Sequence, residues 1–187
     1  MKLYIVNGEN KELPGKFKAP IPLFKELPST VVNGKDNPKI KLKLRRNPAQ
    51  ASSPLYEMEF HQFDGTTTEE YCAFITQWRQ IASQIPLTTA AQKFAQFRGL
   101  VTGMALDNWD TEVSKLYVQL LNTDEGFESA MNEFRGAYCP SDAKTQQRRF
   151  MQRFLSLPKG TSIRTYYNRI QTMWRYFPLL PGVGANI

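Results

Sequence analysis

The stretch FRGLVTGMALDNW, residues 97–109, decides the fold that the sequence predicts. Gly99 and Gly103 lie four residues apart in it, and each glycine costs about 1 kcal/mol relative to alanine in a helix interior. Close approach of a second helix would explain such a cost. We therefore predict the central helix of an all-α domain, with both glycines at helix contacts; an ordinary core helix with tolerated glycines is the alternative. Its apolar face at helical spacing is Phe94, Phe97, Val101, Met104 and Ala105.

The composition suits one or two domains with a buried core, because 41% of the 187 residues are hydrophobic. No run approaches the roughly 18 consecutive apolar residues of a membrane span. The apolar part of the N-terminus is too short for a signal peptide. Cys72 and Cys139 are the only cysteines, so we expect no disulfide framework. We predict a cytoplasmic protein without a membrane partner and leave a nuclear location open.

Charge is distributed unevenly along the chain. Residues 1–60 carry 11 Lys/Arg against 6 Asp/Glu, residues 61–125 carry 4 against 8, and residues 126–187 carry 9 against 3. Basic segments on both sides of an acidic centre are typical of a protein that contacts a polyanion at its ends. A surface charged only for solubility gives a similar count, and that alternative stays open.

Residues 1–62 are predicted to form an extended, basic, proline-rich arm. Seven prolines between residues 14 and 54 break any helix or central strand, and Lys2–Val6 has weak strand character. A cluster of cations at residues 39–46 is of the type that binds phosphates. A short edge strand and a solvated basic linker are the alternatives. The candidate nucleic-acid-binding residues are Lys39, Lys41, Lys43, Arg45 and Arg46.

Residues 63–125 are predicted to form a first helical subdomain. Thr67 and Glu70 have capping-box spacing, and an apolar stripe that includes Trp78 then recurs at helical period up to Pro86. A second helix, capped by Thr88 or Thr89, runs to about residue 106. A weaker third helix is expected from Trp109 to about residue 120.

Residues 126–187 are predicted to form a second helical subdomain after a turn at 122–126. Pro140, Pro158 and Pro178 end three successive helices, and Ser162 or Thr161 caps the last one. Three short helices expose much aromatic surface, since domains of about sixty residues bury only about 60% of their unfolded surface. The candidate helix-packing and assembly residues of both subdomains are Trp78, Gly99, Gly103, Trp109, Phe127, Phe134, Tyr166 and Trp174.

The residues give no enzyme signature. Phosphate-binding glycine loops, zinc-protease motifs and the nucleophile elbow are all missing. His61 is the only histidine, and with two distant cysteines it cannot supply the four ligands of a zinc site. Asp107 and Asp110 are interpreted as a cap or as solvated charges, and Asp64-Gly65-Thr66 as a turn. We predict no catalytic residue, no metal, no cofactor and no small-molecule substrate.

The order of these motifs resembles the Gag capsid region of LTR retrotransposons of the gypsy class. The resemblance covers about residues 55–180. It rests on Phe63-Asp-Gly65, Glu70–Trp78, the pattern Phe97-x-Gly-Leu-x-x-Gly-x-Ala-x-x-x-Trp109, Phe127 with Phe134, Phe150–Leu157, and Leu157-Pro-Lys-Gly160-Thr-Ser162-x-x-x-Tyr166.

This resemblance implies a capsid-like pair of helical subdomains that self-associates into a shell or oligomer around retrotransposon RNA. The gap between Trp109 and Phe127 is long for the family, and its second subdomain continues further than residue 187. A zinc knuckle, the usual RNA-binding module of relatives, is not in this chain. A nucleic-acid-binding module that uses residues 39–46 and the arginines between 148 and 175 is the alternative. A host-domesticated, Gag-derived interaction protein is another.

Overall fold

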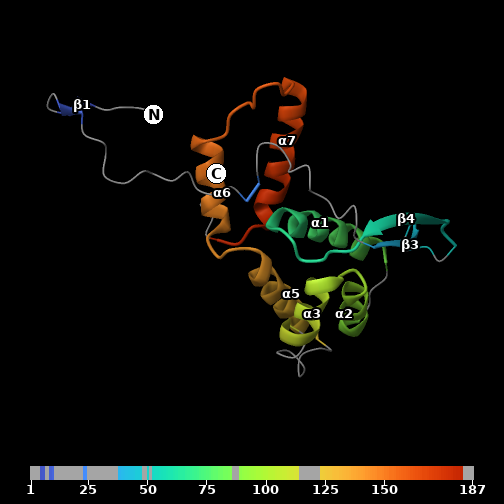
Figure 1. The fold of residues 1–187 in the computed structure, drawn as a ribbon. Coiled ribbons are helices and arrows are strands. Elements are labelled where there is room, and N and C mark those ends of the chain that lie inside the picture. Colours follow the sequence, from blue (N-terminus) through green and yellow to red (C-terminus); the bar gives the residue numbers. More distant parts are fainter. Residues whose placement is uncertain are drawn as a thin grey trace.

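The computed structural model describes residues 5–6, 9–10, 23–24, 38–47, 50, 52–85, 89–113 and 123–182. Most of these residues are helical, as predicted, but two two-stranded sheets are also present, so the all-α class is corrected (Figure 1). The strands are β1 (Ile5–Val6), β2 (Glu9–Asn10), β3 (Lys39–Arg45) and β4 (Leu55–His61). The helices are α1 (Thr68–Gln84), α2 (Ala90–Arg98), α3 (Gly103–Asn108), α5 (Asp124–Tyr138), α6 (Ala143–Arg153) and α7 (Ile163–Tyr176), with short helical turns η1 (Trp109–Val113) and η2 (Phe177–Leu179).

Strands β3 and β4 form an antiparallel hairpin in which Lys41 lies opposite Glu59 and Leu44 opposite Tyr56. Side chains alternate between the faces of a strand, so the lysines of β3 point to solvent and its apolar residues point inward. Leu44 and Phe60 are fully buried, and Phe60 packs edge-on against Phe74 of α1 at 5.9 Å between ring centroids. The extended arm predicted over 1–62 is therefore wrong for β3 and β4, and the short strand given as the alternative for residues 39–46 is found instead. Burial of the apolar side of the hairpin holds it on the helices.

Helix α1 lies at the centre of the molecule, between the β3–β4 hairpin and the other helices (Figure 1). Thr67 caps it by accepting a hydrogen bond from the backbone N–H of Glu70, 3.2 Å away. Its predicted apolar stripe is buried. The buried side chains are Tyr71, Cys72, Phe74, Ile75, Trp78 and Ile81.

The predicted long helix over about 89–106 is interrupted. Thr89, one of the two predicted caps, begins helix α2 with a capping box, but α2 ends at Arg98, and α3 begins only at Gly103. Between them the chain turns at residues 99–100, and Val101 then pairs with Phe63, whose N–H donates to Leu100 O at 3.1 Å and whose carbonyl accepts from Thr102 N at 2.8 Å. These strand-like hydrogen bonds replace helical ones, which is why the helix breaks.

An aromatic core joins α1, α2, η1 and α5. Phe97 lies 4.6 Å from Trp109, 5.3 Å from Trp78 and 5.4 Å from Phe134, between ring centroids. Phe127 and Phe134 come from α5, which begins at Asp124 within the turn predicted at 122–126. The predicted boundary between residues 125 and 126 therefore crosses a shared core, because α5 packs on the first group of helices.

Helices α6 and α7 form a pair at one end of the molecule (Figure 1). Asp142 precedes α6, and the predicted cap of the last helix is confirmed, with Ser162 capping α7. The chain that leaves α7 returns to α6, where the backbone N–H of Lys144 donates to Pro181 O at 3.1 Å. Met173, Phe177 and Leu180 join the common core.

Candidate functional site

Large apolar side chains that face solvent occur on α7 and on the segment that leads into it from α6. Among the described residues, the only other large apolar side chains that are exposed are Leu55 and Met104. A group of such side chains is typical of an interaction surface, whereas single ones are ordinary. The group, called here the apolar face, consists of Phe154 (37% exposed), Leu157 (47%), Ile163 (77%), Tyr167 (59%) and Trp174 (48%).

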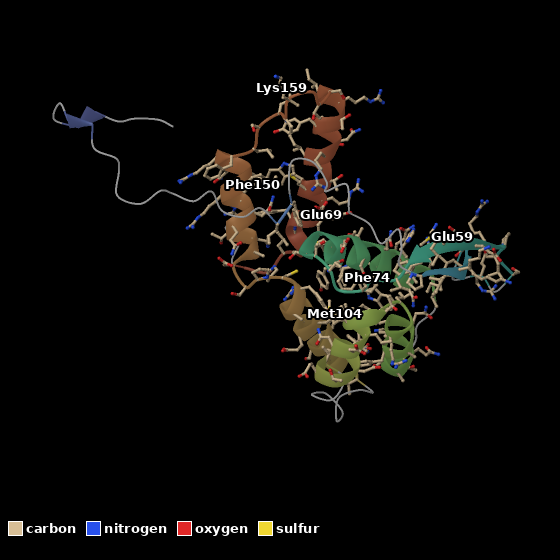
Figure 2. The ribbon with its side chains drawn as sticks, in the orientation of Figure 1. Glu59, Glu69, Phe74, Met104, Phe150 and Lys159 are labelled. Carbon is tan, nitrogen blue, oxygen red and sulfur yellow. The ribbon has the colours of Figure 1, made fainter. Side chains whose placement is uncertain are left out.

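A tight turn between the helices sets the start of α7. Gly160 has φ = +82°, a conformation that favours glycine, and the N–H of Thr161 donates to Pro158 O at 3.1 Å. Ser162 then accepts a hydrogen bond from Thr165 N at 3.1 Å. Lys159 lies at the outer end of this turn (Figure 2). The turn places Ile163 in the first turn of α7, on the same side of the helix as Tyr167 and Trp174.

Helix α7 exposes aromatic surface, as predicted for the three C-terminal helices. Its buried side chains are Arg169 and Met173. Tyr166 is half-buried, and Trp174 is half-exposed with its ring edge-on to Phe177 at 5.7 Å. Trp174, predicted as a helix-packing or assembly residue, thus lies on the apolar face, because the side of α7 that carries Arg169 faces α1.

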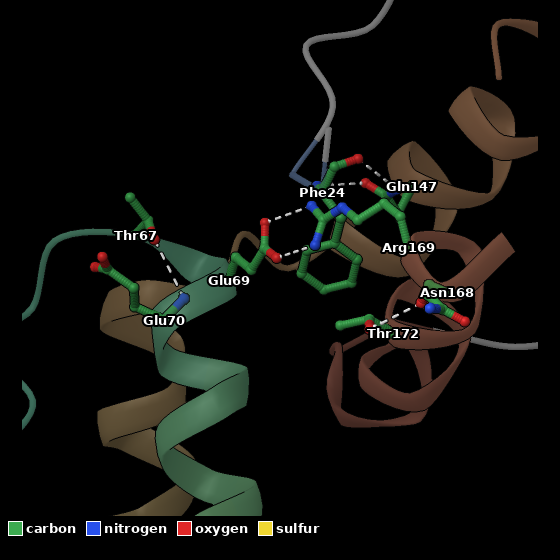
Figure 3. A network of polar contacts seen from close by, with 8 residues as sticks. All are labelled: Phe24, Thr67, Glu69, Glu70, Gln147, Asn168, Arg169 and Thr172. Atoms are coloured by element: carbon green, nitrogen blue, oxygen red, sulfur yellow. Dashed lines mark hydrogen bonds and ion pairs between the residues drawn. The ribbon is translucent and has the colours of Figure 1, made fainter. Parts of the chain in front are cut away.

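Glu69 and Arg169 attach α7 to α1. The guanidinium of Arg169 donates two hydrogen bonds to the carboxylate of Glu69, the one to Oε2 at 2.8 Å, and the two side chains are only 7% and 15% exposed (Figure 3). Planar two-point pairing is the strongest geometry available to these groups. It fixes the rotation of α7 and therefore which of its sides faces outward.

A hollow of about 200 Å³ lies between α6 and α7. Trp174 and Phe177 contribute to its wall from the C-terminal end of α7 and from η2, Met151 contributes from α6, and Leu155 from the segment just after α6. The apolar face therefore adjoins a depression that a side chain of a partner could enter.

The basic residues of β3 lie on the outer face of the hairpin, where acidic residues of β4 accompany them. Lys39 pairs with Glu59 at 3.6 Å and Lys41 with Glu57 at 4.0 Å. Ion pairs of such exposed groups are weak, but each carboxylate reduces the positive potential beside it. Lys43 lies opposite Glu57, and Arg45 and Arg46 follow at the end of the strand.

The predicted helix contacts of the two glycines are corrected. Gly99 is the last-turn cap of α2, and a Cβ there would meet only backbone oxygens of its own helix, 3.5 and 3.7 Å away. Gly103 is exposed at the start of α3 with φ = +51°, and its nearest neighbour would be Cβ of Asp64 at 3.8 Å. The left-handed backbone conformation at residue 103 therefore explains why a glycine occurs there better than helix packing does. Met104, predicted on the inner face, is 68% exposed, since α3 is not the continuation of α2.

Cys72 and Cys139 lie in the core as free thiols. A hydrogen bond with Cys139, together with burial, raises the pKa of the Cys72 thiol. A thiol with a raised pKa and no solvent access is a poor nucleophile. Over the ranges that the structure describes, no group of three His, Cys, Asp or Glu side chains has the arrangement of a metal site, and no helix has the length and apolar character to span a bilayer.

A second hollow, of about 380 Å³, lies between α1, α5 and η2. Arg79, Lys93 and Arg135 lie at its wall beside Trp78 and Phe127. Lys93 is paired with Asp124 at 2.9 Å, so part of this positive charge is neutralised.

Two polar contacts of the α6–α7 pair were not predicted from the sequence. Arg169 and Gln147 occupy positions on the buried sides of their helices, at helical spacing from Met173 and Phe150. A polar residue at a position where the helical spacing predicts a buried apolar one is the signal that could have identified them.

In comparisons with known proteins, no family model, no curated protein and no solved structure matches this chain.

Proposed function

We propose that this chain is a structural, Gag-like capsid protein that self-associates through the apolar face on α7 and the segment that leads into it. The sequence motifs that resemble the gypsy-class Gag capsid region support this proposal, as does a mostly helical fold. In this proposal the protein is cytoplasmic, its work is burial of surface between copies, and it has no catalytic role.

One observation carries the proposal: Ile163 and Tyr167 expose 77% and 59% of their surface on an otherwise well-formed amphipathic helix. A second copy that covers them would remove this apolar area from water, which favours association by about 25 cal/mol per Å². A stable interface needs about 800 Å² per partner, so the whole apolar face and the hollow beside Trp174 would have to take part.

Sedimentation velocity at increasing protein concentration tests the proposal. The wild-type chain is expected to show species above the monomer at tens of micromolar protein. The double variant Ile163→Ser/Tyr167→Ser is expected to remain monomeric with an unchanged melting temperature, because both side chains are exposed in the monomer.

The chain offers a matched control. Leu55 and Met104 are exposed to a similar degree, 57% and 68%, but lie on the hairpin and on α3. Leu55→Ser/Met104→Ser removes comparable apolar area elsewhere and should leave association intact. Equal loss of association in both double variants, or a wild-type chain that is monomeric throughout, would contradict the proposed surface.

RNA is the proposed cargo of the assembly, as in the family that the sequence resembles. The cations that could contact its phosphates are those on the outer face of β3 and the exposed ones near α6 and α7. The latter are Arg149, Arg153, Lys159, Arg164 and Arg175.

A further inference from the structure

The side chain of Gln147 binds the backbone of a segment more than 120 residues earlier in the chain. Its Oε1 accepts hydrogen bonds from the N–H groups of Leu23 at 3.0 Å and Phe24 at 2.9 Å, and its Nε2 donates to Phe24 O at 3.1 Å (Figure 3). Gln147 itself is completely buried in α6. One amide side chain therefore satisfies three backbone groups of Leu23 and Phe24.

The side chain of Phe24 is inserted at the same place. It is completely buried, and its ring is edge-on to Tyr176 of α7 at 5.9 Å between centroids. Leu23 is partly buried and packs against the same core. The segment thus fills a site whose walls come from both α6 and α7.

Backbone hydrogen bonds combined with a pocket for a side chain are a common means by which proteins bind peptides. Backbone hydrogen bonds supply affinity, and a pocket for one side chain supplies specificity. The sequence before the site is Pro20-Ile21-Pro22, and proline has no N–H to donate, so Leu23 and Phe24 are the first two successive donors after it. An empty site would leave the buried amide of Gln147 without these three partners, which is unfavourable. The site therefore favours an occupant at all times.

We infer that the Gln147 site is a peptide-binding site for a Leu-Phe segment, and that the segment of one copy can occupy the site of another. Thirteen residues, 25–37, separate Phe24 from Pro38, which precedes β3, and a chain of that length spans at most about 45 Å. The contacts are identical whether the segment comes from the same chain or from a second copy, which makes exchange a low-cost route to association. The inference deepens the proposed self-association, but it does not require the apolar face.

A fluorescent peptide of residues 18–28 tests the site, with fluorescence anisotropy as the readout. Full-length Phe24→Ala, whose own segment lacks the anchoring ring, is expected to bind this peptide. The wild-type chain should bind it about tenfold or more weakly, because its own segment competes at a high effective concentration. A peptide with alanine at position 24, and the Phe24→Ala/Gln147→Ala chain, should not bind. Equal binding to wild type and Phe24→Ala, or none to a folded Phe24→Ala, overturns the site.

Exchange between copies is tested by mixing two single-defect chains in the Ile163→Ser/Tyr167→Ser background, where the apolar face is removed. One chain carries Phe24→Ala and offers a vacant site, and the other carries Gln147→Ala and offers an intact segment. Circular dichroism melts of each chain establish that both are folded. A heterodimer in the mixture only, detected by sedimentation, supports exchange, and a mixture of monomers overturns it without bearing on the apolar face.

Discussion

Glu69 and Arg169, 100 residues apart in the sequence, form a nearly buried two-point ion pair between α1 and α7. The pair joins the aromatic core around α1 to the helical pair α6–α7, which carries the apolar face. Because a guanidinium presents its donors in a fixed fork, the contact fixes both the distance and the rotation of α7. The surface proposed for assembly therefore depends on an interaction on the opposite side of the same helix.

Removal of one partner of this pair is expected to destabilise the fold strongly. Arg169→Met leaves the carboxylate of Glu69 buried and uncompensated, which costs about 3–5 kcal/mol. The double variant Glu69→Leu/Arg169→Met should lose less than Arg169→Met alone, since an apolar pair needs no compensation. Urea unfolding followed by circular dichroism measures all three chains.

The exposed ion pair between Arg98 and Asp110 is a matched control for this prediction. It has the same two-point geometry, with N–O distances of 2.8 and 2.6 Å, but lies at the surface. Arg98→Met should therefore destabilise the fold far less than Arg169→Met does, because solvent screens an exposed pair. Similar losses for Arg98→Met and Arg169→Met would show that burial is not what makes the Glu69 pair important.

The two glycines of the FRGLVTGMALDNW stretch are expected to respond differently to alanine. Gly103→Ala should destabilise by about 1–2 kcal/mol, because an L-residue is strained at φ = +51°. Gly99→Ala should be neutral or stabilising, because its φ of −66° is helical and alanine is the better helix former. Thermal melts of the two variants check this difference, and a reversed order would contradict the backbone explanation.

The ends of most helices were predictable because they depend on nearby residues. Thr67, Thr89 and Ser162 cap their helices through hydrogen bonds to residues three positions later, so the signal is contained in a short window. The break between α2 and α3 was not predictable in this way. Its cause is pairing with Phe63, more than thirty residues away, whereas the local apolar spacing continues the helical pattern.

The same distinction explains what was missed in the hairpin and on α7. The alternation in residues 39–45 was recognised as strand-like. Its pairing with β4, which begins ten residues later, could not be predicted from those residues alone. On α7, helical spacing identified an apolar side correctly. That this side faces solvent depends on Glu69 of α1, whose contact with Arg169 no local pattern reveals.

Stability is expected to fall at alkaline pH through the buried tyrosine of α1. Burial raises the pKa of Tyr71 well above its ordinary value of about 10. The neutral hydroxyl is thus favoured in the folded state. The contribution of Tyr71 to the free energy of unfolding is therefore complete below pH of about 10 and is lost as the pH rises further. Tyr71→Phe should reduce the loss of unfolding free energy between neutral and strongly alkaline pH, measured by urea unfolding. Tyr167→Phe, on the exposed apolar face, should not change it.

The outer face of the hairpin, which carries the cations of β3, is a candidate contact for nucleic acid. If the cations of β3 bind a phosphate backbone, binding is electrostatic and each neutralised phosphate adds about 0.7 to the salt slope on single strands. The serine variant of Lys41, Lys43, Arg45 and Arg46 should flatten that slope by up to about 3 units. Their neighbours provide a sharper test, because Glu57 and Glu59 pair with Lys41 and Lys39.

Glu57→Gln/Glu59→Gln should strengthen binding of a generic single-stranded RNA and steepen the salt slope, since it releases two lysines without adding a contact. Glu128→Gln/Glu133→Gln removes the same charge from exposed positions of α5 and is the matched control. Fluorescence anisotropy over a range of salt concentrations measures both. A hairpin contact requires a larger gain in the first variant than in the second. Equal gains in RNA affinity would reflect net charge alone. They would indicate that RNA contacts the exposed arginines near α6 and α7 instead of the hairpin.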